Sequence, residues 1–411
     1  MKTWILYLAS LLMAFSTTLI FGDSATALSI FQTLSSFVLQ IGSLIYIPLL
    51  FIGVASGIAS LRRDSLTSKV HTSAIFWILF TSIILPLIAV SIFYFYPTKF
   101  PVSSTAGSQS IQESIFAVAS SSSISALSGN PFYTFAVSST FLLPILVLAW
   151  LFGYALKPNV DVIKPAYAVF NSLSEVMFRI SHYFSVFGYF LVYILATKFF
   201  LSLYNEKTIF VSPIFMITIL AIVVAIVLII LPLIYLIITR HNPYKLLYRT
   251  LAVSIASLVG ANANFTSPLI ESISRHNLGV QKRISASLTP LFAIISKAGS
   301  ATMASIALAS IIYATTGELP TFKILAIIAL LSSLSAFASS SAMGFEISFI
   351  LFCVMKLGKI TLYGAEMTLF GLVPLFLGLG YLIDTEITLM GLSIASIKSK
   401  TNCPTLYNDI L

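Results

Sequence analysis

The sequence predicts an all-α polytopic membrane protein with about eight transmembrane helices and two re-entrant helical hairpins, arranged as inverted repeats. Of its 411 residues, 58% are hydrophobic and only 9% are charged, and the mean hydropathy is +1.02. An ordinary soluble domain carries about 25% charged residues, so lipid must surround most of this chain. Apolar runs close to 20 residues long fit spanning helices rather than the strands of a closed barrel.

The first half of the chain predicts about six ordinary spanning helices. Its apolar stretches are separated by short loops that carry proline, asparagine or charge. They cover residues 4–21, 34–60, 72–97, 131–156, 179–201 and 209–239. The first stretch approaches spanning length, which favours a membrane helix over a cleaved signal peptide. The Ser-rich segment 98–130 is predicted to be an outer loop with a short helix.

The net charge of +9 is concentrated in short loops, and this predicts their side of the membrane. Loops rich in Lys and Arg stay in the cytoplasm, and these loops alternate correctly with the predicted spans. Both termini are therefore expected on the cytoplasmic side of an inner or plasma membrane. This placement argues against a nucleic-acid partner. The loops contain Arg62, Arg63, Lys157, Lys164, Arg240, Arg249, Arg275, Lys282, Arg283, Lys398 and Lys400.

Two broken apolar runs follow residue 245 and predict the re-entrant hairpins. The run 254–273 is interrupted by small and polar residues at 260–268, and the run 322–355 is interrupted at 332–344. Backbone can leave the helix at membrane depth only where protein or a water-filled cavity covers it. The charges that flank each run indicate that it enters and leaves on one side of the membrane.

Each broken run precedes a long apolar segment, at 284–315 and 364–397. A repeated unit of broken run and long helix is typical of inverted-repeat transporters, whose site lies near the bilayer midplane. The predicted organisation is a scaffold with flanking helices at 1–244, a transport core at 245–402 and a cytoplasmic tail at 403–411. The third and sixth spans are candidates to move with the core.

Three ionisable residues are predicted to lie deep in the membrane, where insertion of such a group costs about 2.5–3.5 kcal/mol and marks a functional candidate by default. Lys297 lies 14 residues beyond Arg283, and Asp384 lies 14 residues before Lys398. On a helix that separation is roughly 21 Å, too far for a side chain to reach the interface. Glu346 belongs to the expected tip of the second hairpin, so Lys297 is expected to find Asp384 or Glu346 as its partner.

A stripe of residues around Asp384 predicts a cavity wall. Ile387, Thr388, Gly391 and Ala395 follow it at spacings that place all five residues on one helix face. The stripe combines a carboxylate, a hydroxyl and small residues, which suits a polar cavity.

Each candidate also has a purely structural interpretation. An ion pair of Lys297 with Asp384 or Glu346 could simply keep the interior neutral. Glu346 could instead face outer water. Asn262 and Asn264 at the first tip, and the serines around residue 340 at the second, could only satisfy hairpin backbone. The histidines are scattered and the two cysteines have no paired spacing, so no metal site, cofactor site or catalytic constellation can be assembled. The chain is therefore not expected to be an enzyme.

Five short segments carry a family resemblance. Residues 277–285 read NLGVQKRIS, residues 296–301 read SKAGSA, residues 266–268 read TSP, residues 342–344 read AMG and residues 384–388 read DTEIT. In this order and spacing they resemble the NLGVxKRIS, NMDGTA, TLP, IPG and DxxRT motifs of the dicarboxylate/amino acid:cation symporter family, which includes the glutamate and aspartate transporters.

The resemblance implies a homotrimeric elevator that carries a small-molecule solute across the lipid bilayer, with a static scaffold and a moving core. It places the solute between the two hairpin tips and the last two long helices. It also implies that Asp384 receives a substrate ammonium and that Thr388 adds a hydroxyl contact. The implied solute-binding residues are Asp384, Thr388, Asn262, Asn264, Ser341, Ala342, Gly344 and Ser300.

The sequence departs from the family at the sodium sites. Ala298 stands where the motif has aspartate, with the cation of Lys297 beside it, and Gly391 and Ala395 replace a later asparagine and aspartate. Ile387 replaces the arginine that holds an acidic side chain. The residues expected to substitute for the ion site or to couple transport are Lys297, Glu346, Ser296, Gly391 and Ala395.

A fixed ammonium repels sodium in a low dielectric, so sodium coupling is expected to be weak or lost. The expected function is a symporter-like carrier of a small amino acid or dicarboxylate-type solute, working as a proton-coupled symporter, an exchanger or a facilitator. H+ is thus the favoured coupling ion over Na+. The alternative is a transport-inactive membrane scaffold or solute sensor on the same fold.

Overall fold

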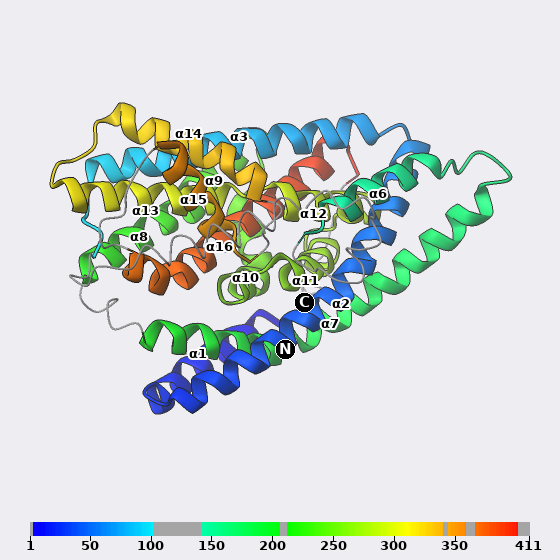
Figure 1. Ribbon diagram of the computed structural model, residues 1–411. Helices are drawn as coiled ribbons and strands as arrows, with labels where there is room; N and C mark the ends of the chain where they lie inside the picture. Colours follow the sequence, from blue (N-terminus) through cyan, green and yellow to red (C-terminus); the bar gives the residue numbers. More distant parts are fainter. Residues whose placement is uncertain (1–2, 102–140, 206–211, 340–343, 359–365, 402–411) are drawn as a thin grey trace.

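The structure is a computed structural model that describes residues 3–101, 141–205, 212–339, 344–358 and 366–401 (Figure 1). Every regular element in these ranges is a helix. Seven helical stretches in the described part of the chain are long and apolar enough to cross a membrane. This confirms the prediction of an all-α polytopic membrane protein. The fourth expected span extends into residues outside the described ranges, and its described part, α6, has only 13 residues.

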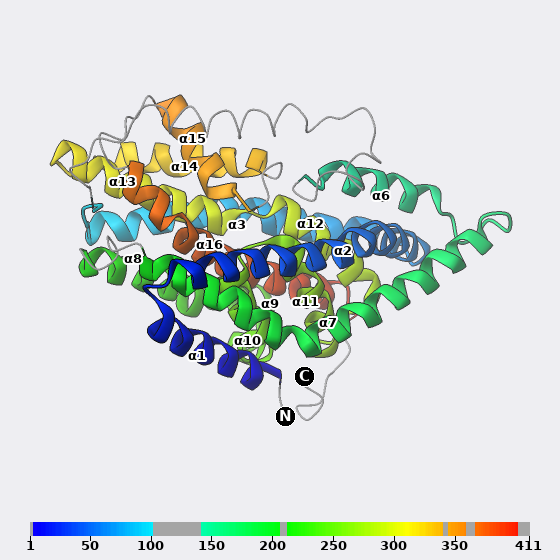
Figure 2. The ribbon, with the colours of Figure 1, turned by 60° about the horizontal axis from the view of Figure 1, so that its bottom comes forward.

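One group of helices comes from the first half of the chain. Its members are α1 (Thr3–Phe21), α2 (Ala25–Arg63), α6 (Leu143–Ala155) and α7 (Lys164–Asn205). Helix α2 packs on both α6 and α7, and α1 packs on α7 (Figures 1 and 2). The Tyr7 hydroxyl of α1 donates to the Ser185 carbonyl of α7 at 2.7 Å. Gly188 makes this contact possible, because a Cβ there would lie 2.0 Å from the same hydroxyl oxygen.

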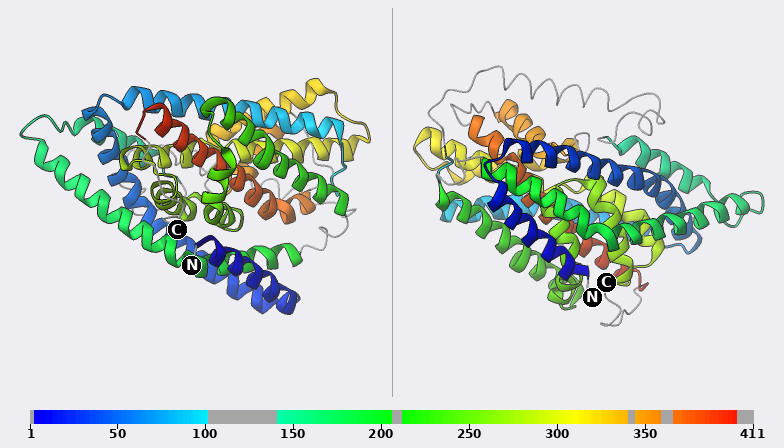
Figure 3. Two further views of the ribbon diagram at one scale, coloured as in Figure 1. Left: turned by 180° about the vertical axis from the view of Figure 1, so that it is seen from behind. Right: turned by 90° about the horizontal axis from the view of Figure 1, so that it is seen from below.

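A second group contains the two predicted hairpin segments and the helices that pack around them. Its members are α3 (Thr67–Phe95), α10 (Pro243–Gly260), α11 (Ala263–His276), α12 (Lys282–Ile295), α13 (Ala298–Thr316), α14 (Phe322–Ala338), α15 (Glu346–Gly358) and α16 (Glu366–Lys398). Helix α13 packs on α3, α14 and α16, and α10 packs on α16. The views from behind and from below show this group beside α1, α2 and α7 (Figure 3).

A single interrupted helix connects the two groups. It consists of α8 (Pro213–Ala225), a π-helical segment (Ile226–Ile230) and α9 (Leu231–Thr239), which packs on α16. Pro232 has no N–H to donate to the Leu228 carbonyl one turn earlier. The Tyr244 hydroxyl donates to that carbonyl at 3.1 Å, so the start of α10 is hydrogen-bonded to the π-helical segment.

The α10–α11 junction is much shorter than the sequence predicted. An interruption was expected across 260–268, but only Ala261 and Asn262 leave the helix. Ala261 takes a left-handed conformation with φ 43°, and the Asn262 side chain accepts the Asn264 N–H at 2.8 Å as the cap of α11. Helix α11 then continues through Pro268. A well-formed cap starts the new helix at once, and this is why the small and polar residues after it remain helical.

The long segment expected at 284–315 is divided in the structure. Helix α12 ends at Ile295, Ser296 is extended, and Lys297 has the non-helical angles φ −124° and ψ 33° before α13 begins at Ala298. The prediction of one continuous helix was therefore wrong at this point. Because of this break, Lys297 does not continue either helix. The first N–H groups of α13 have no acceptor within their own helix and can bond to a side chain from another helix.

The second broken run ends its first helix at Ala338 and resumes at Glu346. Residues 340–343, which include Ser341 and Ala342, lie outside the described ranges. Gly344 has φ +86°, a left-handed conformation that glycine adopts without a Cβ penalty. Helices α14 and α15 pack on each other and on α13.

Candidate functional site

Three chain breaks meet in the interior of the second helix group: the α10–α11 junction, the start of α15 and the α12–α13 break. The first two approach each other closely, because a Cβ built on Gly344 would lie 3.4 Å from Asn262 Nδ2. The third supplies Lys297, Gly299 and Ser300, which contact α15 and α16. Segments as far apart in sequence as residues 262 and 384 are thus brought to one polar centre.

Lys297 forms a buried ion pair with Glu346. Its Nζ lies 3.0 Å from Glu346 Oε1, and the two side chains are 2% and 0% exposed. The Tyr381 hydroxyl of α16 also donates to Glu346 Oε1, and the Lys297 ammonium lies 4.8 Å from the centre of the Tyr381 ring. Glu346 Oε2 accepts the Gly344 N–H at 2.8 Å. Both carboxylate oxygens therefore have partners, which a buried ion pair needs if it is to offset its desolvation.

Of the partners that the sequence offered for Lys297, Glu346 forms the direct contact. The hypothesis that Glu346 faces outer water is wrong, since its side chain is fully buried. Asp384 lies near enough for the charge of Lys297 to act on it, but it is hydrogen-bonded elsewhere. The pair also closes the start of α15 against the α12–α13 break.

Asp384 caps the start of α13. Its Oδ1 accepts the Gly299 N–H at 2.7 Å, and its Oδ2 accepts the Ser300 hydroxyl at 3.2 Å. A carboxylate at this position is stabilised by the positive end of the helix dipole. The approach depends on Gly299, where a Cβ would lie 2.2 Å from the Gly380 carbonyl oxygen. The side chain of Asp384 is 6% exposed and is directed into protein rather than lipid.

The stripe that follows Asp384 serves two different purposes. Thr388 lies one turn away, is 3% exposed and donates its hydroxyl to the Asp384 carbonyl at 2.8 Å. Farther along, a Cβ at Gly391 would lie 2.4 Å from Phe292 and 2.7 Å from Trp77. Trp77 of α3 also donates to the Ile387 carbonyl at 2.9 Å. Aromatic rings therefore fill the space at Gly391, and the predicted cavity wall is a helix contact at this end.

The other predicted site residues have distinct positions. Asn262 caps α11 beside Gly344, as described above. Asn264 instead turns toward α2, where its Nδ2 donates to Ser43 Oγ at 3.0 Å. Ser296 and Ala395 are buried, with 2% and 1% of their surfaces exposed.

Three polar residues in the interior of the second helix group were not predicted from the sequence. Tyr381 precedes Asp384 by three residues, so helical spacing places it on the same face. Glu271 and Glu386 are carboxylates within largely apolar stretches, and the rule that flagged Glu346 applies equally to them. Both are buried, and Glu386 Oε1 accepts the Ser254 hydroxyl of α10.

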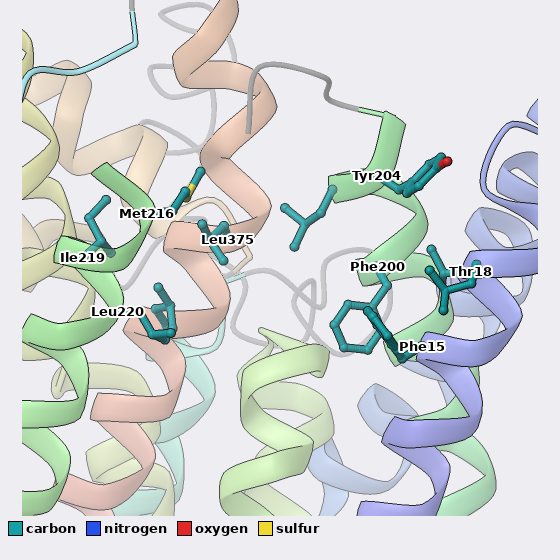
Figure 4. A pocket seen from close by; sticks show the side chains of 11 residues that line it. Phe15, Thr18, Phe200, Tyr204, Met216, Ile219, Leu220 and Leu375 are labelled. Atoms are coloured by element: carbon teal, nitrogen blue, oxygen red, sulfur yellow. The ribbon is translucent and has the colours of Figure 1, made fainter. Parts of the chain in front are cut away.

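An apolar pocket lies away from this polar centre. Its volume is about 280 Å³, and it is bounded by side chains of α1, α7, α8 and α16 (Figure 4). Phe15, Phe200, Leu220 and Leu375 are among its lining residues. The hydroxyl of Thr18, also in the lining, donates to the Ala14 carbonyl at 3.0 Å. The pocket suits hydrocarbon rather than a charged solute.

Comparison with protein-family models identifies a match over most of the chain. The model of the sodium:dicarboxylate symporter family matches residues 7–392, nearly the whole chain. No curated protein matches the sequence. The match begins far upstream of residues 245–400, where the sequence motifs lie, and covers most of α1 and all of α2 and α7.

Proposed function

Because the chain belongs to the sodium:dicarboxylate symporter family, we propose that it is a secondary transporter of a small amino acid or dicarboxylate-type solute with weakened or lost sodium coupling. The observation that carries this proposal is the buried Lys297–Glu346 ion pair, at 3.0 Å, between the α12–α13 break and the start of α15. A covalently attached cation occupies the region where the family motif has its sodium-binding aspartate.

The solute site proposed is the space between the two tips and α16. Asn262 and Gly344 border it from the tips, and Asp384, Thr388 and Ser300 border it from α16 and α13. Asp384 keeps lone pairs for a substrate ammonium while the Gly299 N–H and the Ser300 hydroxyl hold its orientation. Ile387 is buried and apolar, so nothing at that position grips a second carboxylate. Of the two solute classes proposed, this favours a small amino acid without an acidic side chain over a dicarboxylate.

Electrostatics disfavours a sodium ion beside Lys297. Two unit charges 4 Å apart repel by about 4 kcal/mol at an effective dielectric constant of 20. That repulsion corresponds to a loss of roughly a thousandfold in affinity. Ala298, Gly391 and Ala395 contribute no side-chain oxygen ligands to offset it. The Lys297 ammonium, by contrast, has Glu346 Oε1 and the Tyr381 hydroxyl oxygen within 3.4 Å.

The packing supports an elevator mechanism. In this proposal α1, α2 and α7 form the static part, and α10–α16 move across the membrane as a unit, with α10–α11 and α14–α15 as re-entrant hairpins. Helix α3 packs on α13, α14 and α16, and α9 packs on α16, so both move with the core. A homotrimer assembled through the static part follows from the family.

The test is uptake by the full-length protein in proteoliposomes. A panel of labelled neutral amino acids, acidic amino acids and dicarboxylates is offered with an inward sodium gradient, with choline in place of sodium, and with an inward proton gradient. The proposal expects uptake of one class at rates that differ by less than about twofold between sodium and choline. Uptake that rises steeply with sodium would show that a sodium site persists beside Lys297.

A transport-inactive sensor or scaffold is the second candidate. It is favoured by the same ion pair, because Lys297 and Glu346 satisfy each other's charge within the protein. Saturable solute binding by purified protein together with the absence of uptake under all three gradients would identify this function. Both binding and uptake are expected if the protein is a carrier.

A further inference from the structure

A polar cavity lies between the two helix groups, at the C-terminal end of α2, the N-terminal end of α7 and the start of α12. Its volume is about 520 Å³, and Arg63, Lys282 and Arg283 contribute three cations to its lining against the single carboxylate of Asp64. The sequence predicts that the loops at this end are cytoplasmic. We name it the α2–α7–α12 cavity.

The positive charge around this cavity is incompletely neutralised. Asp64 is shared by two arginines, with Arg63 Nε at 3.2 Å and Arg283 in direct contact. Glu175 is shared in the same way, at 3.3 Å from both Arg275 and Lys282. Four cations thus share these two carboxylates, and the buried Glu271 lies near Arg275 and Lys282 rather than near the two arginines at Asp64. The like charges of Arg63 and Arg283 also repel each other.

Two further features favour an anion in the cavity. Helix α12 begins at Lys282, so the positive end of its dipole lies at the cavity. Arg63 is the most accessible of the cations, with a side chain that is 50% exposed. An arginine guanidinium presents paired N–H donors that match phosphate oxygens, and basic pockets between transmembrane helices are known to bind phosphate-bearing head groups.

We propose that the α2–α7–α12 cavity binds the phosphate group of an anionic ligand, either a phospholipid headgroup or a free cytosolic phosphate. The phosphate bridges Arg63 of α2 to Arg283 of α12, and it relieves the repulsion between the two arginines. Lys282 contributes its positive charge to the site, while its ammonium is held by the backbone and side-chain oxygens of Asn171 at 2.7 and 3.1 Å and by Glu175. Because α2 and α12 belong to different helix groups, the bound anion stabilises the arrangement in which these groups touch. Phosphate binding by this cavity does not depend on the proposed transport function. Only the idea that the bound phosphate restrains movement of the transport core rests on that function.

The proposal is tested by binding, so that it can fail separately from transport. Inorganic phosphate is titrated into the purified full-length protein at constant ionic strength, with chloride as the reference anion, and the thermal unfolding midpoint is followed. In parallel, the protein is taken from vesicles of phosphatidylcholine with or without phosphatidylglycerol, and retained lipid is measured by native mass spectrometry. Arg63→Gln is compared with Arg62→Gln, a matched control on the same turn.

Arg62 is a suitable control because it donates to the Tyr154 carbonyl outside the cavity lining. Arg63→Gln should weaken the apparent affinity for the phosphate group by about tenfold or more, whereas Arg62→Gln should change it by less than about twofold. If Arg63→Gln but not Arg62→Gln loses binding of inorganic phosphate, the ligand is a free anion. If Arg63→Gln loses only the retained phosphatidylglycerol, the ligand is a lipid headgroup. If neither probe stabilises the protein, or if both variants lose binding equally, the proposal is wrong.

Arg240→Gln provides a second control if Arg62→Gln fails to fold. Arg240 is exposed at the end of α9 and lies outside the cavity lining. The unfolding midpoint without ligand is compared for all variants, since Arg63 is exposed and its substitution should leave the fold unchanged. A drop in that midpoint for Arg63→Gln alone would assign the residue a structural role and would also overturn the proposal.

Discussion

The α10–α11 junction is closed by neutral groups, whereas the start of α15 is closed by charges. Asn262 caps α11 through its own side chain, and Asn264 donates to Ser43 of α2, so the first tip is held locally and against the other helix group. Glu346, in contrast, bonds its own Gly344 and otherwise depends on Lys297 of the α12–α13 break and on Tyr381 of α16.

This difference has a consequence for movement. A cap within one turn persists whatever the neighbouring helices do, because its donor and acceptor are two residues apart. A buried ion pair between distant segments persists only while those segments stay together, and separation leaves charges in an apolar interior. The start of α15 is therefore expected to shift when the packing of α13 and α16 changes, and the α10–α11 junction is expected to keep its conformation.

The largest effect is expected when the ion pair is broken from one side. Lys297→Met should destabilise the protein by about 3–5 kcal/mol, because it leaves the Glu346 carboxylate buried without its cation. Lys323→Met, an exposed position on α14, serves as the control and should change stability by less than about 0.5 kcal/mol. Denaturant unfolding of the purified protein measures both.

The double variant Lys297→Met/Glu346→Gln tests the cause of that loss. If the cost arises from an unpaired charge, the double variant should recover much of the stability that Lys297→Met loses. If the losses of unfolding free energy from the two single substitutions simply add, the two charges do not depend on each other. The contrast between the α10–α11 junction and the start of α15 would then disappear.

Tyr381→Phe should have an intermediate effect, since it removes only the hydroxyl that donates to Glu346 and keeps the ring beneath Lys297. A hydrogen bond to a charged group contributes about 1.5–3 kcal/mol. Tyr235→Phe is the matched control, because its hydroxyl lies 2.8 Å from the neutral Ser393 hydroxyl and should contribute about 1 kcal/mol. Equal losses in unfolding free energy would argue against a charge-assisted bond at Glu346.

Asn262→Ala should cost less, about 1 kcal/mol, as expected for loss of a helix cap. Asn262→Asp keeps an acceptor for the Asn264 N–H and should retain most of the stability. Hydrogen exchange at the first turn of α11 provides the measurement, and faster exchange should appear in the alanine variant alone. A loss as large as that of Lys297→Met would show that the first tip, too, depends on distant partners.

The smallest effect is expected at Glu175, which joins α7 to Arg275 and Lys282. Its side chain is 44% exposed, so solvent screens both pairs and Glu175→Gln should cost less than about 1 kcal/mol. Adding salt should reduce the difference from the unmodified protein. A larger or salt-independent loss would mean that the contact between the helix groups depends on buried charge.

Much of the architecture was accessible from local sequence. The apolar runs predicted the α1, α2, α3 and α7 spans, and the motif at 277–285 indicated the family whose model matches residues 7–392. The boundaries inside the broken runs were less accessible. A helix resumes at Ala263 because Asn262 forms a cap, and that depends on one side-chain rotamer rather than on composition.

The candidate site was only partly accessible. The spacing from the nearest basic loops identified Lys297 and Asp384 as interior groups. It could not show that the helix breaks at Ser296, nor that Gly299 and Gly380 allow α13 to start against α16. Tyr381 was missed because a tyrosine in an apolar run is usually ordinary packing.

The sequence by itself determined that this protein lies in a membrane, that its interior contains a lysine, and that this lysine needs an acidic partner. The physical reason is the free energy of hydration. Exposing so much apolar surface to water is unfavourable, and so is placing an unpaired ammonium in lipid. The tertiary structure alone decided that the partner is Glu346, whereas Asp384 caps α13. These contacts join residues 49 and 85 positions apart, and such pairings depend on how helices pack rather than on any local pattern.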